Sequence, residues 1–371
     1  MSESPSVLLL PGIEPTADPA LEAALRRKMD HKAKPLGALG RLEALAAKLG
    51  LIQRSETITL EHPQLLVFAA DHGIADEGVS AYPQSMTLQM VLTLLAGGAA
   101  VNVLARQHGF ATTVVDAGVA STVPDHDEHA PGFPLLVRRK IGFGTRNMLL
   151  RAAMSQEQAT AALHAGMDAV QYLPGNVVAF GDMGVGNTSS AALLLSRLGG
   201  VPLRDAVGLS GAMDDAPLQR KHEILGRVAA RHRGALLPLD ALAAMGGFEI
   251  AMMAGAMLRA ASQQRVILVD GFVAGAAALV ARRLCAAVTD YMVFCSCADD
   301  DGHRRLLSHL QVKPLLDLDL RLGEGAGALL AWPLVQSAGL LLNEMATRPG
   351  TAAVSGATPA TPATPDARTG R

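Results

Sequence analysis

One carboxylate stands between two glycines in the stretch RLGEGAGALLAW, which runs from Arg321 to Trp332. Glycine is costly inside regular structure and useful where the backbone turns tightly or approaches another group closely. Glu324 in such a turn has two interpretations. It stabilises the start of the apolar helix that follows, as acidic residues commonly do, or it acts as a general base on a ligand held at the turn. The local pattern alone favours the first.

A glycine-rich turn in the stretch GDMGVGNTSSAALLL, Gly181–Leu195, is the second candidate site. The pattern predicts a strand end, a turn containing Gly184 and Gly186, and a helix that begins at Asn187 and Thr188. Backbone N–H groups at a helix start bind anions, and glycines let a phosphate come close. The spacing differs from the dinucleotide fingerprint, and no Gly-Lys-Ser/Thr follows, so this is not a Walker A loop. Phosphate binding and a tight turn capped by Asn or Thr both stay open.

Two further polar groups have ordinary alternatives. Asp71 and His72 follow an apolar run, but no other His or carboxylate occurs at metal-ligand spacing, so we expect a hydrogen-bonded loop histidine. Asp214 and Asp215 precede a predicted helix, where acidic residues are common. Lys221 either contacts a ligand or is a solvated surface charge.

The composition argues for small-molecule chemistry. Lys and Arg number 32 against 34 for Asp and Glu, so no net field attracts nucleic acid or an anionic membrane. Aromatic residues make up only 3%, which is little material for stacking on bases. The three cysteines, Cys285, Cys295 and Cys297, fit neither a disulfide framework nor zinc spacing, so we expect buried thiols and no metal. We find neither a signal peptide nor a clean apolar run of roughly 20 residues, and we expect a soluble cytoplasmic protein.

Alternating strand and helix patterns predict the fold class. Short apolar runs that end in glycine or polar residues fit strands buried on both faces, and longer apolar segments between them fit helices. We therefore expect an α/β fold with a mainly parallel sheet flanked by helices, and ligands beyond the carboxyl ends of its strands. The strands are expected at 65–73, 112–118, 177–184, 266–271 and 291–297, and the helices at 86–106, 156–171, 189–198, 248–261 and 275–284.

The chain divides into three parts. Residues 1–60 read as a helical segment, with strong periodicity over 38–54, and residues 61–345 contain the α/β pattern. Residues 346–371 are rich in Pro, Thr, Ala and Gly without apolar periodicity, which predicts a disordered tail.

Six stretches in a fixed order carry a resemblance to a known family. They are KPLGALGRLE (Lys34–Glu43), DHGIADEGVSAYPQ (Asp71–Gln84), LAGGAAVNVLA (Leu95–Ala105), GTRNM (Gly144–Met148), GDMGVGNTSSAALL (Gly181–Leu194) and LDLRLGEGAGA (Leu318–Ala328). Together they resemble the nicotinate-nucleotide–dimethylbenzimidazole phosphoribosyltransferase family, which makes the lower-ligand nucleotide of cobalamin. The resemblance extends from about Ala24 to Thr347.

The resemblance implies a base exchange on a ribose phosphate, with no metal or redox cofactor. Dimethylbenzimidazole attacks C1′ of nicotinate mononucleotide, nicotinate leaves, and α-ribazole phosphate forms with inversion. Nicotinate leaves from a cationic pyridinium and needs no acid, whereas the acceptor loses its N–H proton and needs one base within hydrogen-bond reach. The family fold is a Rossmann-like sheet with a small helical domain formed partly by the N-terminus, and the family forms homodimers.

The resemblance also implies roles for single residues, and it makes Glu324 the catalytic base. Its glycine neighbours, including Gly323, leave room for a flat ring. The family matches further imply a nucleotide cradle at Gly184, Gly186, Asn187 and Thr188, a lysine near the reacting nucleotide at Lys221, and an acceptor pocket shaped by Ser80, Tyr82 and Gln89.

Three departures from the family pattern fall near the nucleotide. The family usually has Glu where this chain has Asp182, and Gly-Arg-Gly-Thr-Gly where Gly208–Ala212 reads GLSGA. A usual Ser-x-Glu is replaced at Ala298 and Asp300. We therefore keep two alternatives, a ribosyl C–N hydrolase or phosphorylase and a degenerate paralogue that binds nucleotide or base without catalysis. A nicotinamide dehydrogenase is disfavoured because the glycine spacing is wrong.

Overall fold

A parallel sheet forms the centre of the computed structural model, which describes residues 8–125, 133–208 and 216–348. Its strand order is β3-β2-β1-β4-β5-β6, so the order reverses between β1 and β4. All seven residues of β1 are buried, as expected for a strand covered on both faces. The strands are β1 (Gln64–Ala70), β2 (Ala111–Gly118), β3 (Leu135–Arg138), β4 (Val177–Met183), β5 (Val266–Val269) and β6 (Met292–Phe294).

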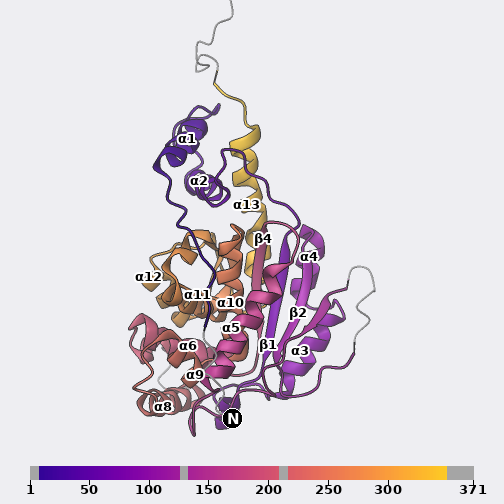
Figure 1. Cartoon of the computed structure of the whole chain (residues 1–371), viewed down its shortest axis with the longest axis vertical. Coiled ribbons are helices and arrows are strands. Elements are labelled where there is room, and N and C mark those ends of the chain that lie inside the picture. The colour runs from indigo at the N-terminus through magenta and orange to yellow at the C-terminus, as the bar shows by residue number, and fades with distance from the viewer. Residues whose placement is uncertain (1–7, 126–132, 209–215, 349–371) are drawn as a thin grey trace, which may run out of the picture.

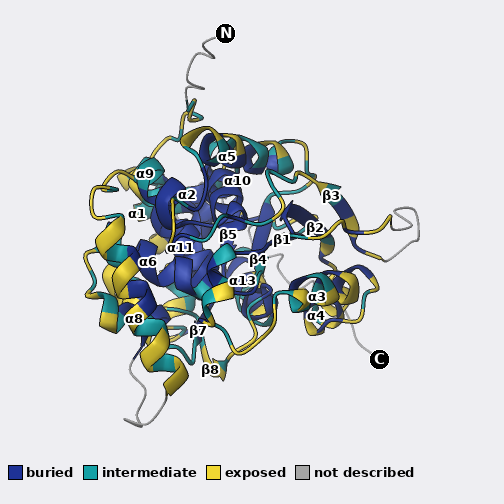
Figure 2. Cartoon of the chain, turned by 90° about the horizontal axis from the view of Figure 1, so that it is seen from below, coloured by how far each residue is buried: buried dark blue, intermediate teal, exposed yellow. Residues whose placement is uncertain are grey.

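Helices cover both faces of this sheet. Figure 2 shows α5 and the dark blue, buried α10 on one side, and α3, α4 and α13 on the other. The α-helices are α1 (Pro19–Asp30), α2 (Arg41–Gln53), α3 (Ser85–Leu95), α4 (Ala100–His108), α5 (Gln156–Gln171), α6 (Asn187–Gly199), α7 (Leu203–Val207), α8 (Ala216–Arg231), α9 (Pro238–Met245), α10 (Phe248–Ser262), α11 (Gly271–Leu284), α12 (Asp301–Leu310) and α13 (Ala326–Glu344). Two 3-10 helices are η1 (Gly73–Glu77) and η2 (Ala286–Tyr291), and a second small sheet pairs β7 (Ser296–Ala298) with β8 (Leu316–Leu320).

The mainly parallel α/β fold is therefore confirmed, but two expected elements are divided. The expected strand 291–297 is two strands in different sheets, because the chain pairs with β5 through Phe294 and with β8 from Ser296 onward. The expected helix 86–106 is two helices, α3 and α4, because Gly97 adopts a φ of 71° between them. β3 and β8 were not expected. The apolar run of β3 is only three residues long, and β8, which reads LDLDL, is mostly exposed and has no continuous apolar run.

A small helical unit forms at the far end of α13. Figure 1 shows α1 and α2 beside the C-terminal part of α13 at the top of the molecule. The Lys32 amine donates a hydrogen bond to the Met345 carbonyl (2.8 Å), and Lys32 also forms a β-bridge with Thr347. Residues 346–348, which the sequence pattern assigned to the tail, are therefore paired with the N-terminal segment. The remainder of that predicted tail lies outside the described residues.

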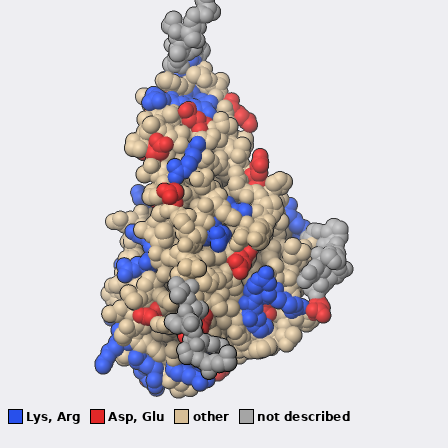
Figure 3. Space-filling view, in the orientation of Figure 1, with Lys and Arg blue, Asp and Glu red and all other residues tan. Residues whose placement is uncertain are grey.

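Two apolar helical stretches, Ser85–His108 and Ala326–Glu344, are long and apolar enough to cross a membrane by length and composition. The second is α13, which packs against α2, α4 and β4, so protein contacts account for its apolar character. The first is interrupted at Gly97 and keeps an exposed apolar side. On the face drawn in Figure 3, charges of both signs are scattered among uncharged residues.

Candidate active site

A cavity of about 380 Å³ opens at the carboxyl ends of β4 and β5, beside the point where the strand order reverses between β1 and β4. Open parallel sheets bind their ligands at this point. The cavity collects side chains from β4, the starts of α6 and α11, the end of β7 and the turn before α13. Its lining residues are Asp182, Met183, Gly184, Asn187, Thr188, Gly271, Phe272, Val273, Ala298, Asp299, Asp300, Leu320, Arg321, Leu322 and Gly323.

The turn that carries Glu324 has an unusual backbone. Gly323, Glu324 and Gly325 have φ values of 72°, 59° and 88°, so three consecutive residues lie in the left-handed region. A non-glycine residue rarely adopts this conformation, and it persists only where the surroundings impose it. Here β4 imposes it, because a Cβ atom on Gly181 would lie only 2.1 Å from the Glu324 carbonyl oxygen. The flanking glycines are therefore needed to press the turn against the sheet.

Glu324 is not a helix cap. Gly325 occupies the N-cap position of α13, and the Glu324 carboxylate, 2% exposed as a residue, has an Oε2 atom without a hydrogen-bond partner. Burial raises the pKa of Glu324 above its usual value. A buried carboxylate without a partner, beside a cavity, is suited to accept a proton from a ligand.

Asp270 anchors the helix behind this turn. It accepts hydrogen bonds from the Gly327 backbone N–H (2.8 Å) and from the Ser296 hydroxyl. Because Gly327 belongs to the first turn of α13, Asp270 fixes the helix start that follows Glu324 directly. The sequence pattern predicted no role for Asp270, which lies within the strand expected at 266–271.

Asp182 lies beside the turn, at the end of β4. A Cβ atom on Gly323 would lie 3.8 Å from its Oδ1, and Asn187 donates to its Oδ2 (2.8 Å). Burial raises the pKa of Asp182 to about 7, with help from the charges of Glu249, Asp270 and Glu324 and against the Asn187 hydrogen bond. Asp182 therefore lines the cavity with a raised pKa, and Glu324, whose pKa is also raised, directly follows the lining residue Gly323 but is not itself among the lining residues.

The predicted cradle lies along the same cavity, at the start of α6. Gly186 is the N-cap residue with a φ of 94°, and a Cβ atom on Gly184 would lie 2.2 Å from the Ala70 carbonyl oxygen. The Lys221 amine donates to the Thr188 hydroxyl (3.0 Å), so Lys221 is not a free surface charge. Burial lowers the pKa of Lys221, while the charge of Asp300 opposes that shift.

Only some of the residues predicted to bind the acceptor base lie near the site. Ser80 and Lys221 line a neighbouring cavity of about 580 Å³ between the segment 78–81 and the start of α8. The Lys221–Thr188 hydrogen bond therefore links this cavity to the first one. Tyr82, which is 65% exposed, and Gln89, also exposed, are not among the residues lining either cavity.

The departures from the family pattern gather in one place. Asp182, Ala298 and Asp300 all line the 380 Å³ cavity, although 116 residues separate Asp182 from Ala298 in the sequence (298 − 182). The GLSGA segment lies outside the described residues except for Gly208, whose carbonyl accepts a hydrogen bond from His222 Nε2 (2.9 Å).

Several lining residues were missed by sequence reasoning. Phe272 and Val273 supply an apolar wall from the start of α11, and Arg321 pairs with Asp299 at the rim. The apolar run that ends at Gly271 correctly predicted a strand end at this edge of the sheet. Nothing in that run predicted that Phe272 and Val273, the next two residues, line the cavity.

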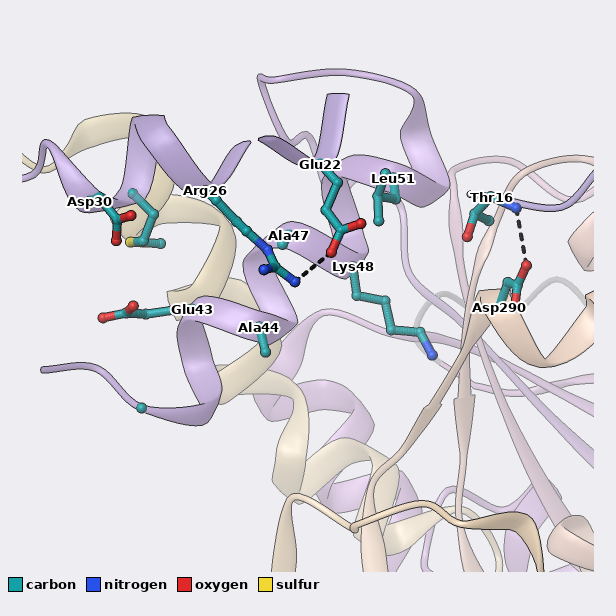
Figure 4. Close-up of a pocket in the computed structure, with 12 residues that line it drawn as sticks. Thr16, Glu22, Arg26, Asp30, Glu43, Ala44, Ala47, Lys48, Leu51 and Asp290 are labelled. Atoms are coloured by element: carbon teal, nitrogen blue, oxygen red, sulfur yellow. Dashed lines mark hydrogen bonds and ion pairs between the residues drawn. The ribbon is translucent and has the colours of Figure 1, made fainter. Parts of the chain in front are cut away.

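A larger cavity of about 660 Å³ lies elsewhere, between α1, α2 and η2. Figure 4 shows acidic and basic side chains on its walls, including an ion pair between Arg26 and Glu22 (2.5 Å). Lys48 also lines it, and burial lowers the pKa of Lys48 to about 8. None of the predicted site residues borders this cavity. Its walls carry charges of both signs, so they do not indicate a particular class of ligand.

Within the described ranges, no three or more His, Cys, Asp or Glu side chains are grouped to hold a metal ion. Cys295 and Cys297 are buried free thiols, as expected, and Cys285 is half-buried.

A parallel sheet with a cavity at its switch point and a buried carboxylate beside it is the architecture of an α/β enzyme that acts on a small molecule.

Comparison with known proteins identifies the family within this class of enzymes. A family model described as phosphoribosyltransferase matches residues 14–353. The nicotinate-nucleotide–dimethylbenzimidazole phosphoribosyltransferase of Cupriavidus taiwanensis is 55% identical over 348 residues, which cover 93% of this chain and 98% of that protein. The protein of the same name from Variovorax paradoxus is 52% identical, over 91% of this chain and 95% of that protein.

A solved structure agrees with this result. The crystal structure of the enzyme of that name from Thermus thermophilus has a TM-score of 0.83 and 40% identity, covering 89% of this chain and 97% of that one. The chain therefore belongs to this phosphoribosyltransferase family, and the resemblance seen in the sequence is confirmed.

Proposed function

We propose that this enzyme transfers the phosphoribosyl group of nicotinate mononucleotide to dimethylbenzimidazole, giving α-ribazole phosphate and nicotinate in cobalamin lower-ligand synthesis. Family membership and the names of the relatives support these substrates. The single observation that carries the proposal is Glu324, a buried carboxylate without a partner that is held beside the switch-point cavity.

In the proposed reaction, one ring nitrogen of dimethylbenzimidazole attacks C1′ of the donor from the face opposite nicotinate. The C1′–N bond to nicotinate breaks, and its electron pair neutralises the pyridinium. Glu324 removes the proton from the other acceptor nitrogen, which the raised pKa of Glu324 favours. Positive charge that develops at C1′ is stabilised by the nearby carboxylates, and the remaining acceleration comes from holding the two rings in line.

The donor's phosphate is assigned to the turn at Gly184 and Gly186 and the start of α6. The helix dipole and the backbone N–H groups at a helix start favour an anion there. Three N–H groups of this segment already donate to other groups, namely those of Val185, Asn187 and Ser189. Lys221, bonded to Thr188 at the same helix start, supplies positive charge near the nucleotide. Ser80 faces the neighbouring cavity, which we assign to the acceptor base.

The direct test incubates the protein with nicotinate mononucleotide and a panel of benzimidazoles, purines and phenols, with products identified by mass. We expect α-ribazole phosphate and an equal amount of nicotinate. Release of ribose phosphate without an adduct would instead identify a hydrolase. Donor binding without any product would identify a paralogue that has lost catalysis.

We also propose that the enzyme is a cytoplasmic homodimer. Four large apolar residues are 40–53% exposed: Leu92 of α3, Val103 of α4, and Phe133 and Leu135 at the start of β3. A Cβ atom on Gly97, between α3 and α4, would lie 3.7 Å from the Phe133 ring. We call these four residues the α3–α4 surface. Large apolar side chains grouped at one place usually mark an interaction site, and a second copy of the chain is the simplest partner.

A further inference from the structure

A buried ion pair lies directly behind the proposed phosphate turn and has no part in the chemistry described so far. His72 Nε2 lies 2.6 Å from Glu249 Oε1, and both side chains are fully buried. On the other side of the ring, His72 Nδ1 lies 3.0 Å from the Ser190 hydroxyl. The sequence correctly predicted a hydrogen-bonded histidine, but it gave no partner for Glu249, which is 177 residues away.

The imidazole ring supports the turn itself. A Cβ atom on Gly186 would lie 3.3 Å from His72 Cβ, and one on Gly184 would lie 3.6 Å from His72 Cδ2. Between these glycines, the Val185 N–H donates to the Thr87 hydroxyl (3.1 Å). The His72 side chain therefore leaves little space behind either glycine, and the residue between them is held by its hydrogen bond to Thr87.

The groups around His72 favour its charged form. Burial by itself lowers the pKa of His72, but the charge and hydrogen bond of Glu249, followed by the charges of Asp71 and Asp182, outweigh burial and raise that pKa. Glu249 comes from α10, Asp71 from the end of β1 and Asp182 from β4. Ser190, from α6, serves either state, because its hydroxyl donates to a neutral Nδ1 or accepts from a protonated one.

The pair also has a buried polar atom without a hydrogen-bond partner. This is unexpected for an ion pair that serves only the stability of the fold. Glu249 Oε2 is buried without a hydrogen-bond partner, and such a group is a cost to stability. Gly247 leaves the space that the pair occupies, because a Cβ atom there would lie 2.4 Å from both Glu249 Oε2 and His72 Cε1. The fold therefore makes room for a charged pair at this place.

We propose that His72 is a positioning residue for the donor phosphate, which holds the turn at Gly184–Gly186 in shape and places a buried positive charge beneath it. Glu249 and Ser190 fix the orientation of the ring. This inference rests on the proposed function, since it assumes that the turn receives the phosphate of nicotinate mononucleotide. His72 touches neither substrate and acts through the backbone of the turn.

The test compares nicotinate mononucleotide with nicotinic acid riboside, which lacks the phosphate, by calorimetry. In His72→Gln we expect the mononucleotide Kd to rise about tenfold, as for loss of a modest charge interaction, while the riboside Kd stays within twofold of wild type. His232→Gln is the matched control. His232 makes its hydrogen bond from Nε2 to a backbone group, the Met148 carbonyl (2.8 Å), away from the turn. This control should leave both affinities unchanged.

A second variant separates charge from stability. His72→Leu/Glu249→Met removes both partners, and replacing a whole buried ion pair by apolar residues is often neutral for folding. We expect wild-type melting and a mononucleotide affinity as weak as that of His72→Gln. If this stable double variant binds the mononucleotide like wild type, the pair is structural only and the inference is overturned.

The wild-type pH profile adds an independent readout. Because the groups around His72 raise its pKa, the preference for mononucleotide over riboside should hold at neutral pH and fall as the pH rises through that raised pKa. Deprotonation of His72 removes the positive charge, while the phosphate, whose second pKa is about 6, is already a dianion. A preference that stays constant up to the highest pH at which the protein remains folded would contradict the inference. If wild type neither binds the mononucleotide nor forms product, the proposed function itself fails, whereas an active wild type with unaffected variants rejects only the role of His72.

Discussion

Glu324 illustrates how a single acid is prepared for proton transfer by its surroundings. Water is excluded from it, no donor satisfies Oε2, and its backbone is fixed in a strained conformation between two glycines. The first two of these features raise the free energy of the ionised carboxylate in the resting enzyme, and the third holds it in place. A ligand that brings an N–H group to Oε2 would relieve this cost and begin to transfer its proton.

Glu324→Gln tests this role. Glutamine keeps the shape of the side chain but cannot take the proton, and loss of a general base typically lowers the rate by about 10²–10⁴. We expect kcat to fall within this range and the donor Kd to stay within twofold. Wild-type turnover in this variant would show that Glu324 has no catalytic part.

A pH profile tests the neighbouring carboxylates. Because Glu324 must be ionised to act, kcat/KM should fall as the pH is lowered through the raised pKa of Glu324. The charge of Glu324 raises the pKa of Asp182, whereas burial alone raises the pKa of Glu324. Asp182→Asn should therefore leave the acid limb where it is in wild type. A limb that moves to lower pH in this variant would mean that a charged Asp182 also raises the pKa of Glu324.

The departures at Asp182 and Ala298 make a prediction about donor affinity. Asp182 is one methylene shorter than glutamate, and Ala298 has no hydroxyl to offer a phosphate oxygen. Hydrogen bonds to charged groups contribute about 1.5–3 kcal/mol, equivalent to about ten- to a hundredfold in affinity. Asp182→Glu/Ala298→Ser should therefore tighten binding of nicotinate mononucleotide in calorimetry. An unchanged or weaker Kd would show that the cavity uses different contacts.

At the level of the elements, the site depends on how closely the turn before α13 is packed against β4. Asp182 and the cradle lie at one edge of the sheet because both occur where β4 ends and α6 begins, while β5, the neighbour of β4, brings the start of α11 to the same edge. The turn with Glu324 reaches the same edge only because Gly181 has no side chain. The cavity is thus assembled from contacts between elements rather than within one.

Gly181→Ala tests this contact. The new Cβ atom would lie 2.1 Å from the Glu324 carbonyl oxygen, so the turn must move. A displacement of about 1 Å near the chemistry costs on the order of 10² in rate, and we expect kcat to fall by about that factor. Gly226→Ala in α8 is the control, since no heavy atom lies within 4 Å of its Cβ position and the helix should gain about 1 kcal/mol. Wild-type kcat in Gly181→Ala would refute the tight contact.

These elements also show what the sequence could and could not predict. Buried strands such as β1 and β4 have continuous apolar runs, so their places and the polar residues at their ends were predicted correctly. The exposed β8 lacks such a run, and Gly97 divides one apolar stretch into two helices. Glu249 stood out as one charge in an apolar helix, but its pairing with His72 is a long-range contact that no local pattern records.

At the scale of the whole molecule, α13 connects the site to the small helical unit. Its 19 residues correspond to about 28 Å at the usual rise of an α-helix, so the unit formed by α1 and α2 lies far from Glu324 of the same chain. The stretch KPLGALGRLE belongs to this remote unit. There Lys34 pairs with Glu43 (2.8 Å), an ion pair that holds the loop before α2. Part of the family resemblance therefore lies in a structural feature outside the site.

The α3–α4 surface provides the last prediction, which concerns assembly. A stable interface needs about 1,200–2,000 Å² of buried area with an apolar centre. This surface supplies exposed large apolar residues from α3, α4 and the start of the edge strand β3. Wild type should sediment as a dimer at micromolar concentration. Val103→Asp should yield monomers, because a charge buried at an apolar interface without a partner costs several kcal/mol. Leu236→Asp, at a 63% exposed leucine between α8 and α9, should leave the dimer intact.

Since Ser85–His108 is also apolar enough for a membrane by composition, flotation with lipid vesicles completes the test. A monomeric wild type that floats with vesicles would show that this surface meets lipid rather than a second copy of the chain.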